Sequence, residues 1–273
     1  MDNCKVIAIT NQKGGVGKTT TTVNLGVGLV KEGYRVLLID ADPQGSLTVS
    51  LGVKNPDELP VSLASVLQRV IEDRPINEHM GIIQHQEGVD LLPSNIELSG
   101  LEISLFNVMS REFILKGYVD EIRKNYDYIL IDCMPSLGMM TVNSLVAADS
   151  VIIPSQPNFL STKGLNLLMH SISKVKRQIN PKLEVGGIFL TMANDTNFRK
   201  DVVKAIKENY KRHFPVFDTV IPATIRLGEI STKDKSIFKH DRGGKAAKAY
   251  ANLVKEVQGI GERQRIQPSD LSR

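Results

Sequence analysis

The chain has 273 residues, 41% of them hydrophobic, and a formal net charge of +4. This length suffices for one large α/β domain with a sizeable core. No apolar run approaches the roughly 18 residues of a membrane span, and the N-terminus lacks the basic-then-apolar layout of a signal peptide, so we expect a cytoplasmic protein without a membrane partner.

The first predicted element is a buried strand over residues 4–10, which runs into a glycine-rich loop and a helix over 20–31. Glycines let successive backbone N–H groups point at phosphate oxygens, and the helix N-terminus adds its positive dipole end. Lys18 supplies a charge for the phosphates and Thr19 a hydroxyl for Mg²⁺. We therefore predict a nucleotide site formed by Gly14, Gly15, Val16, Gly17, Lys18, Thr19 and Thr20.

The loop departs from the usual G-x-x-x-x-G-K-[ST] pattern, because its first position is Gln12. A second lysine, Lys13, stands instead directly before Gly14. This K-G-G-x-G-K-T form is the deviant Walker A motif, and it resembles the ParA/MinD/Soj group of ATPases. The resemblance implies ATP as the nucleotide, and a homodimer in which Lys13 reaches the phosphates of the partner subunit. A glycine-rich turn with an incidental lysine is the alternative.

The second predicted strand, over 35–39, is followed directly by Asp40 and then by Asp42. Ligands of open α/β sheets lie beyond the carboxyl ends of the strands, so this strand directs two carboxylates toward the phosphate site. An acidic turn that merely follows a strand is the alternative. The family resemblance implies that Asp42 positions the attacking water and that Asp40 supports the magnesium shell.

A third buried strand, over 126–132, ends in Asp132, a Walker B layout whose carboxylate would hold Mg²⁺. Relatives commonly carry two prolines after the following cysteine, and Met134 replaces the first here. Cys4 and Cys133 lie in apolar strands far apart in the chain, which indicates buried reduced thiols. Together the motifs and the resemblance assign catalysis to Lys13, Lys18 and Asp42, and the metal to Thr19, Asp40 and Asp132.

The remaining pattern alternates short strands with helices. We predict further strands at 81–85, 89–92, 150–154 and 186–192, and helices at 62–71, 98–106, 111–124, 141–147, 160–179, 197–210 and 243–257. This alternation predicts the α/β fold of a P-loop NTPase, a doubly wound, mostly parallel sheet with helices on both faces. We expect one ATPase domain over residues 1–258 and a polar tail over 259–273. His79 and His85 lack partners at metal-ligand spacing and are interpreted as surface or structural residues.

Positive charge is concentrated in the last third, where residues 199–248 hold 13 Lys and Arg against 6 Asp and Glu. Such a surface suits contact with duplex DNA phosphates without sequence reading, although a solvated lysine face is the alternative. The candidate DNA residues fall into one stripe on the predicted 197–210 helix and several later clusters: Lys200, Lys204, Lys207, Lys211, Arg226, Lys233, Lys235, Lys239, Arg242 and Lys245.

Residues 220–229 resemble the family stretch I-P-R-N-V-R-L-S-E, with Ala223 at its first arginine. Relatives hold the adenine near Pro222 and near the strand end at Met192 and Asn194. The resemblance further implies slow hydrolysis, stimulation by a ParB-like centromere-binding protein, nonspecific DNA binding and nucleoid association. A MinD-like regulator that acts on a membrane surface or a protein assembly is the alternative, although the tail lacks the basic amphipathic pattern of a membrane anchor. A metabolic P-loop kinase would need an acceptor pocket that the sequence does not reveal.

Overall fold

The computed structural model describes residues 4–157, 163–193 and 214–265. Within them eight strands form one sheet in the order β3-β4-β2-β5-β1-β6-β7-β8. Neighbouring strands are parallel, except that β3 is antiparallel to β4. The strands are β1 (Lys5–Ile9), β2 (Val36–Ala41), β3 (Ile83–Gln84), β4 (Asp90–Leu92), β5 (Tyr128–Cys133), β6 (Ser150–Ser155), β7 (Glu184–Ala193) and β8 (Val216–Pro222).

Helices cover both faces of this sheet, because its central strands are hydrophobic at nearly every position. All six residues of β2 and all six of β5 are buried, as in a parallel sheet with two covered faces. The longer helices are α1 (Lys18–Lys31), α3 (Leu63–Ile71), α4 (Glu97–Ser104), α5 (Ile114–Ile122), α6 (Met139–Ala147), α7 (Lys163–Gln178) and α11 (Lys245–Arg265), and the short ones are α2 (Ser46–Ser50), α9 (Ile225–Glu229) and α10 (Ile237–His240).

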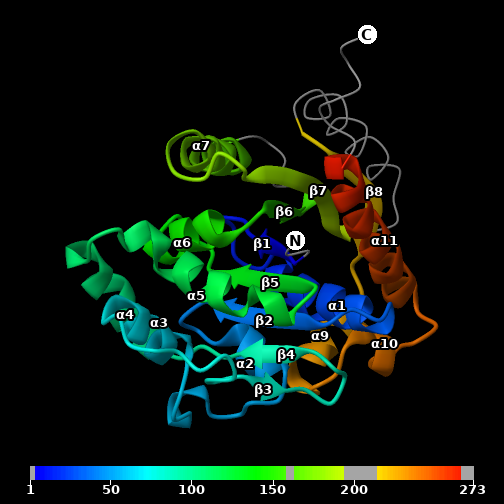
Figure 1. Cartoon of the computed structure of the whole chain (residues 1–273). Coiled ribbons are helices and arrows are strands. Elements are labelled where there is room, and N and C mark those ends of the chain that lie inside the picture. Colours follow the sequence, from blue (N-terminus) through cyan, green and yellow to red (C-terminus); the bar gives the residue numbers. More distant parts are fainter. Residues whose placement is uncertain (1–3, 158–162, 194–213, 266–273) are drawn as a thin grey trace.

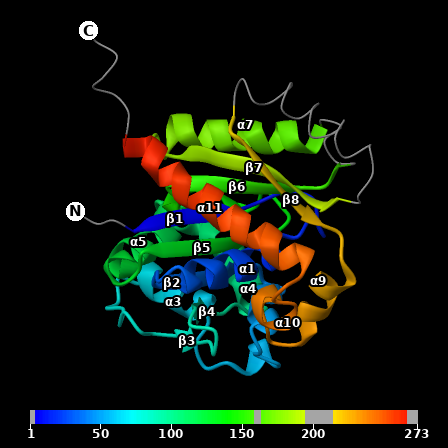
Figure 2. The ribbon, with the colours of Figure 1, turned by 90° about the vertical axis from the view of Figure 1, so that its right-hand side faces the viewer.

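Alternate residues of the central strands β1, β2, β5 and β6 point into two separate cores. Val6 and Ala8 of β1 pack with α3 to α7, whereas Ile7 and Ile9 pack with α1, α2, α10 and α11. Figure 1 shows α5 and α6 on one side of the strands and α1 and α11 on the other. In Figure 2, which views the molecule from that second side, α11 crosses in front of the sheet. The predicted doubly wound α/β fold is therefore confirmed.

The structure corrects two predicted helices. The sequence pattern predicts that the last helix ends at residue 257, but α11 continues to Arg265. Its extension brings Ile260 against the core on that face, where its Cδ1 lies beside Gly186, and this contact compensates for the weak helix propensity of Gly259. The predicted polar tail thus begins inside a helix. The helix predicted over 111–124 is shorter, because 3₁₀ turns at Arg111–Phe113 and Arg123–Asn125 flank α5. The helix predicted over 197–210 lies outside the described residues.

Candidate nucleotide and metal site

The glycine-rich loop leaves the sheet at the carboxyl end of β1, which lies between β5 and β6. Gly15 has φ 70° and Gly17 has φ 87°, so both occupy the left-handed region that a side chain would strain. Gly17 forms the N-cap of α1, which begins at Lys18. Gly14, by contrast, does not have a positive φ. An added Cβ there would meet no atom within 4 Å, so Gly14 leaves open space above the loop.

Buried hydrogen bonds from neighbouring strands hold this loop in place. Thr191 near the end of β7 donates its hydroxyl to the carbonyl of Val16 at 2.7 Å. Asn11 donates its amide to the carbonyl of Pro154 in β6 at 2.8 Å and accepts from the backbone N–H of Lys13 at 3.0 Å. These bonds from the tertiary structure fix the path of the loop.

The predicted metal residues Thr19 and Asp132 meet at the start of α1. The Thr19 hydroxyl donates to Asp132 Oδ2 at 2.6 Å, and Thr22 donates to Oδ1 at 3.3 Å. Asp132 is buried, and this burial raises its pKa above the ordinary value, while the hydrogen bond from Thr19 opposes the shift. A hydroxyl beside a carboxylate fits Mg²⁺, which takes few protein ligands and fills its remaining positions with phosphate oxygens and water. Among the described residues, no three His, Cys, Asp or Glu side chains gather as a self-sufficient metal site.

Lys18 points back over the loop. Its Nζ lies 3.4 Å from the carbonyl oxygen of Lys13, and only 7% of the residue is exposed. Burial lowers the pKa of Lys18, whereas the nearby carboxylates of Asp132 and Asp42 act in the opposite direction. A buried ammonium group beside a formed anion-binding loop is suited to phosphate.

Asp40, near the end of β2, is held in the interior by hydrogen bonds. Asp40 lies opposite Asp132 in the register of β2 and β5 and is fully buried. Its carboxylate accepts hydrogen bonds from the hydroxyl and the backbone N–H of Thr48, at 2.7 and 2.8 Å, and from the N–H of Asp42 at 3.2 Å. Burial raises the pKa of Asp40 to about 6 in spite of these bonds. Asp40 therefore fixes the loop that presents Asp42, and its role beside magnesium stays a prediction.

The predicted adenine residues are placed in part. Met192 has φ 52°, is 43% exposed and lies near Gly17, while Ala193 beside it pairs with Pro222 of β8. Asn194 lies outside the described residues. Sequence reasoning missed Gln156, which directly follows β6 and contacts Lys13, Gly15 and Met192. The strand-end rule that identified Asp40 and Asp42 also applies to Gln156, since β6 adjoins β1.

The candidate DNA residues fall into two groups. Lys200, Lys204, Lys207 and Lys211 lie outside the described residues. The other six are exposed on α9, α10 and the segment up to the start of α11: Arg226, Lys233, Lys235, Lys239, Arg242 and Lys245.

Glu229 partly neutralises this basic segment. It lies 3.2 Å from the guanidinium of Arg226 and 3.5 Å from the ammonium of Lys233. A hydrogen bond with His240 and another from Arg226 lower the pKa of Glu229 to about 2.

His85 is structural, as expected: its side chain is buried and its Nε2 lies 2.7 Å from Asp234 Oδ1.

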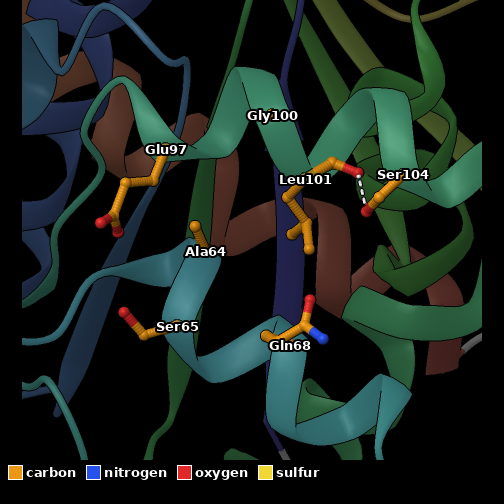
Figure 3. Close-up of a pocket in the computed structure, with 7 residues that line it drawn as sticks. All are labelled: Ala64, Ser65, Gln68, Glu97, Gly100, Leu101 and Ser104. Carbon is orange, nitrogen blue, oxygen red and sulfur yellow. Dashed lines mark hydrogen bonds between the residues drawn. The ribbon is translucent and has the colours of Figure 1, made fainter.

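A separate pocket of about 390 Å³ lies between α3 and α4. Figure 3 shows Leu101 of α4 directed toward α3, where Ala64, Ser65 and Gln68 line the opposite wall. None of the predicted site residues lines it.

Across the described part of the chain, no helix is both long and apolar enough to cross a membrane.

Comparison with known proteins gives concordant matches. The AAA domain family matches residues 4–185. The chain is 41% identical to the sporulation initiation inhibitor protein Soj of Bacillus subtilis, over 94% of this chain and 99% of that protein. It is 39% identical to the chromosome partitioning protein ParA of Caulobacter vibrioides, over 93% of each. A solved structure described as cobyrinic acid a,c-diamide synthase from Mycobacterium smegmatis, with bound ATP analog and magnesium, superimposes with a TM-score of 0.84 at 36% identity, covering 98% of this chain and 99% of that one.

Proposed function

Because this chain belongs to the ParA/Soj family of P-loop ATPases, we propose that it is a DNA-partitioning ATPase that binds ATP with Mg²⁺, dimerises around the nucleotides and releases DNA on hydrolysis. The observation that carries this proposal is the loop from Lys13 to Thr20. It lies at the carboxyl edge of the sheet, and its Thr19 hydroxyl is hydrogen-bonded to Asp132. A solved relative at 36% identity holds an ATP analog and magnesium, which supports the choice of ligands.

In this proposal each residue of the site has a defined task. Backbone N–H groups around Gly15 and Gly17 bind phosphate oxygens, and Lys18 neutralises their charge. Thr19 and Asp132 hold Mg²⁺, which when bound supplies further charge neutralisation of the phosphates. Asp42 orients the attacking water from its loop at the end of β2. Phosphoryl transfer needs little more from a protein than this positioning, which is consistent with slow hydrolysis until a partner stimulates it.

Dimerisation would connect the nucleotide to DNA. Lys13 is proposed to reach the phosphates held by the second subunit, so ATP completes a site that one subunit cannot complete alone. Two copies of the exposed basic segment from Arg226 to Lys245 then act together on DNA phosphates, and ATP raises DNA affinity by linkage. A ParB-like DNA-binding protein is the proposed stimulating partner, and a nucleoid location would follow from the DNA affinity.

Amide formation is a second candidate, because the structure from Mycobacterium smegmatis is described as a diamide synthase. A cysteine that released ammonia from an amide donor would need an accessible thiolate. The two cysteines of this chain, Cys4 and Cys133, are both buried, and burial raises the pKa of Cys133 to about 12. Amide transfer through a cysteine is therefore disfavoured.

Dimerisation is tested by light scattering with ATP and with ADP on the wild type, Lys13→Ala and Asp42→Ala. We expect ATP to double the mass of the wild type and of Asp42→Ala, which binds ATP without hydrolysing it, whereas Lys13→Ala stays monomeric. Lys182→Ala, at an exposed lysine in the turn before β7, is the matched control. A Lys13→Ala protein that dimerises like the control would remove this lysine from the mechanism.

DNA binding is tested by titrating salt against duplex affinity in both nucleotide states. We expect affinity only with ATP, with a steep salt dependence that Lys235→Glu weakens and Lys182→Glu leaves unchanged. Equal affinity with ATP and ADP would refute the switch. Co-sedimentation with anionic liposomes, in place of plasmid, would instead support the MinD-like alternative.

A further inference from the structure

Gln156 connects three parts of the nucleotide site through one side-chain amide. Its Oε1 accepts a hydrogen bond from the Lys13 ammonium at 3.0 Å. Its Nε2 lies 3.0 Å from the carbonyl oxygen of Gly15 and 3.0 Å from the sulfur of Met192. The amide thus accepts from the lysine that distinguishes this loop and donates to the backbone of the same loop.

The position of Gln156 is fixed by the sheet. It directly follows β6, which pairs with β1 and whose last residue, Ser155, is fully buried. The carbonyl of Pro154, two residues before Gln156, accepts a hydrogen bond from the side-chain amide of Asn11, and Asn11 Oδ1 in turn accepts one from the backbone N–H of Lys13. Asn11 therefore ties the start of the loop to β6, the strand that Gln156 follows, so the backbone on both sides of the contact between Lys13 and Gln156 is anchored to β6.

We propose that Gln156 is the positioning residue that keeps Lys13 within its own subunit and thereby sets how readily Lys13 reaches a second one. The part about the second subunit rests on the proposed function, whereas the holding of Lys13 does not. Gln156 acts through Lys13 and is not itself a catalytic residue. It restrains Lys13 in the monomer and opposes premature dimerisation.

Two substitutions at this position have opposite expected effects. Gln156→Ala removes this acceptor and weakens the restraint on Lys13. Gln156→Glu replaces a neutral acceptor with a charged one and holds Lys13 more firmly, because hydrogen bonds between charged groups are stronger. Both variants lose the bond to the Gly15 carbonyl, so a general disturbance of the loop would change every measurement in the same direction.

The holding of Lys13 is tested in the nucleotide-free protein by the rate at which an amine-acylating reagent modifies it, read by peptide mass spectrometry. The exposed Lys182 in the same sample is the internal reference. Relative to wild type, we expect about threefold faster modification of Lys13 in Gln156→Ala, the worth of one ordinary hydrogen bond, and slower modification in Gln156→Glu. Unchanged rates, or a shift of both variants in the same direction, would overturn the proposal.

The consequence for assembly is tested by sedimentation velocity with a saturating non-hydrolysable ATP analogue. Because each subunit gives up one such bond, we expect the dimer dissociation constant to fall by about tenfold in Gln156→Ala and to rise in Gln156→Glu. A dimer of unchanged affinity in both variants would refute the link between Gln156 and assembly. A wild-type protein that binds the analogue and stays monomeric would refute the proposed dimer, while the acylation result would still decide whether Gln156 holds Lys13.

Discussion

Thr48→Val tests whether the end of β2 is fixed by a buried carboxylate. The Thr48 hydroxyl donates to Asp40 Oδ2 at 2.7 Å and accepts from the backbone N–H of Ser94 at 2.9 Å, and both Thr48 and Asp40 are fully buried. Valine keeps the shape of threonine but breaks both bonds. A hydrogen bond to a charged group contributes about 2 kcal/mol, and an orphaned buried N–H costs about 1–3 kcal/mol, so we expect a loss of about 3–5 kcal/mol at pH 8.

The same change should depend on pH. Burial raises the pKa of Asp40 from 3.8 to about 6, so the folded protein retains this proton where the unfolded chain has lost it. Ionised Asp40 therefore costs the wild type stability as pH rises from about 4 to 6, by up to about 3 kcal/mol. The Thr48 hydroxyl stabilises the ionised form, so its removal costs most above pH 6. At pH 5 the carboxyl is mostly protonated, and we expect the loss to shrink to about 2 kcal/mol.

Urea denaturation followed by circular dichroism, without nucleotide and with chelator, measures both values. Thr48→Ser is the control, because it retains the hydroxyl and removes one buried methyl group, at a cost of about 1 kcal/mol at either pH. A loss that is equal at pH 5 and pH 8, or a serine variant as unstable as the valine variant, would show that the Asp40 contact does not fix this loop.

Two further predictions concern packing and the phosphate loop. Gly28→Ala places a methyl group 2.5 Å from Val254 Cγ2, between α1 and α11, and should lower the free energy of unfolding by about 1–3 kcal/mol. At Gly100 an added methyl group meets nothing within 4 Å, so Gly100→Ala is the control and should raise the free energy of unfolding by about 0.5–1 kcal/mol through helix propensity. Thermal unfolding measures both changes. Equal unfolding temperatures would contradict this packing. Thr191→Val removes the hydroxyl that donates to the buried carbonyl of Val16, and it should weaken binding of an ATP analogue by about tenfold in calorimetry. An unchanged affinity would show that other contacts fix the loop.

Much of this fold and site can be predicted from short stretches of the sequence. The apolar run over 4–10, the glycines of the loop and the aspartate at the end of β5 each follow from short-range rules about strands, turns and phosphate binding. Their common edge follows from the geometry of parallel sheets. For this reason the sequence predicts that Thr19 and Asp132 meet, although 113 positions separate them.

The tertiary structure decided which partners the charged and polar groups have. Thr48 donates a hydrogen bond to Asp40, and Gln156 accepts one from Lys13, 143 positions away in the chain. Glu229 forms ion pairs with Arg226 and Lys233. Sequence periodicity encodes which face of an element is buried, but a hydrogen bond across the sheet depends on strand order and on the path of each loop. The sequence by itself therefore determined the nucleotide loop and its carboxylates, whereas only the packing of β6 against β1 decided that Lys13 contacts Gln156.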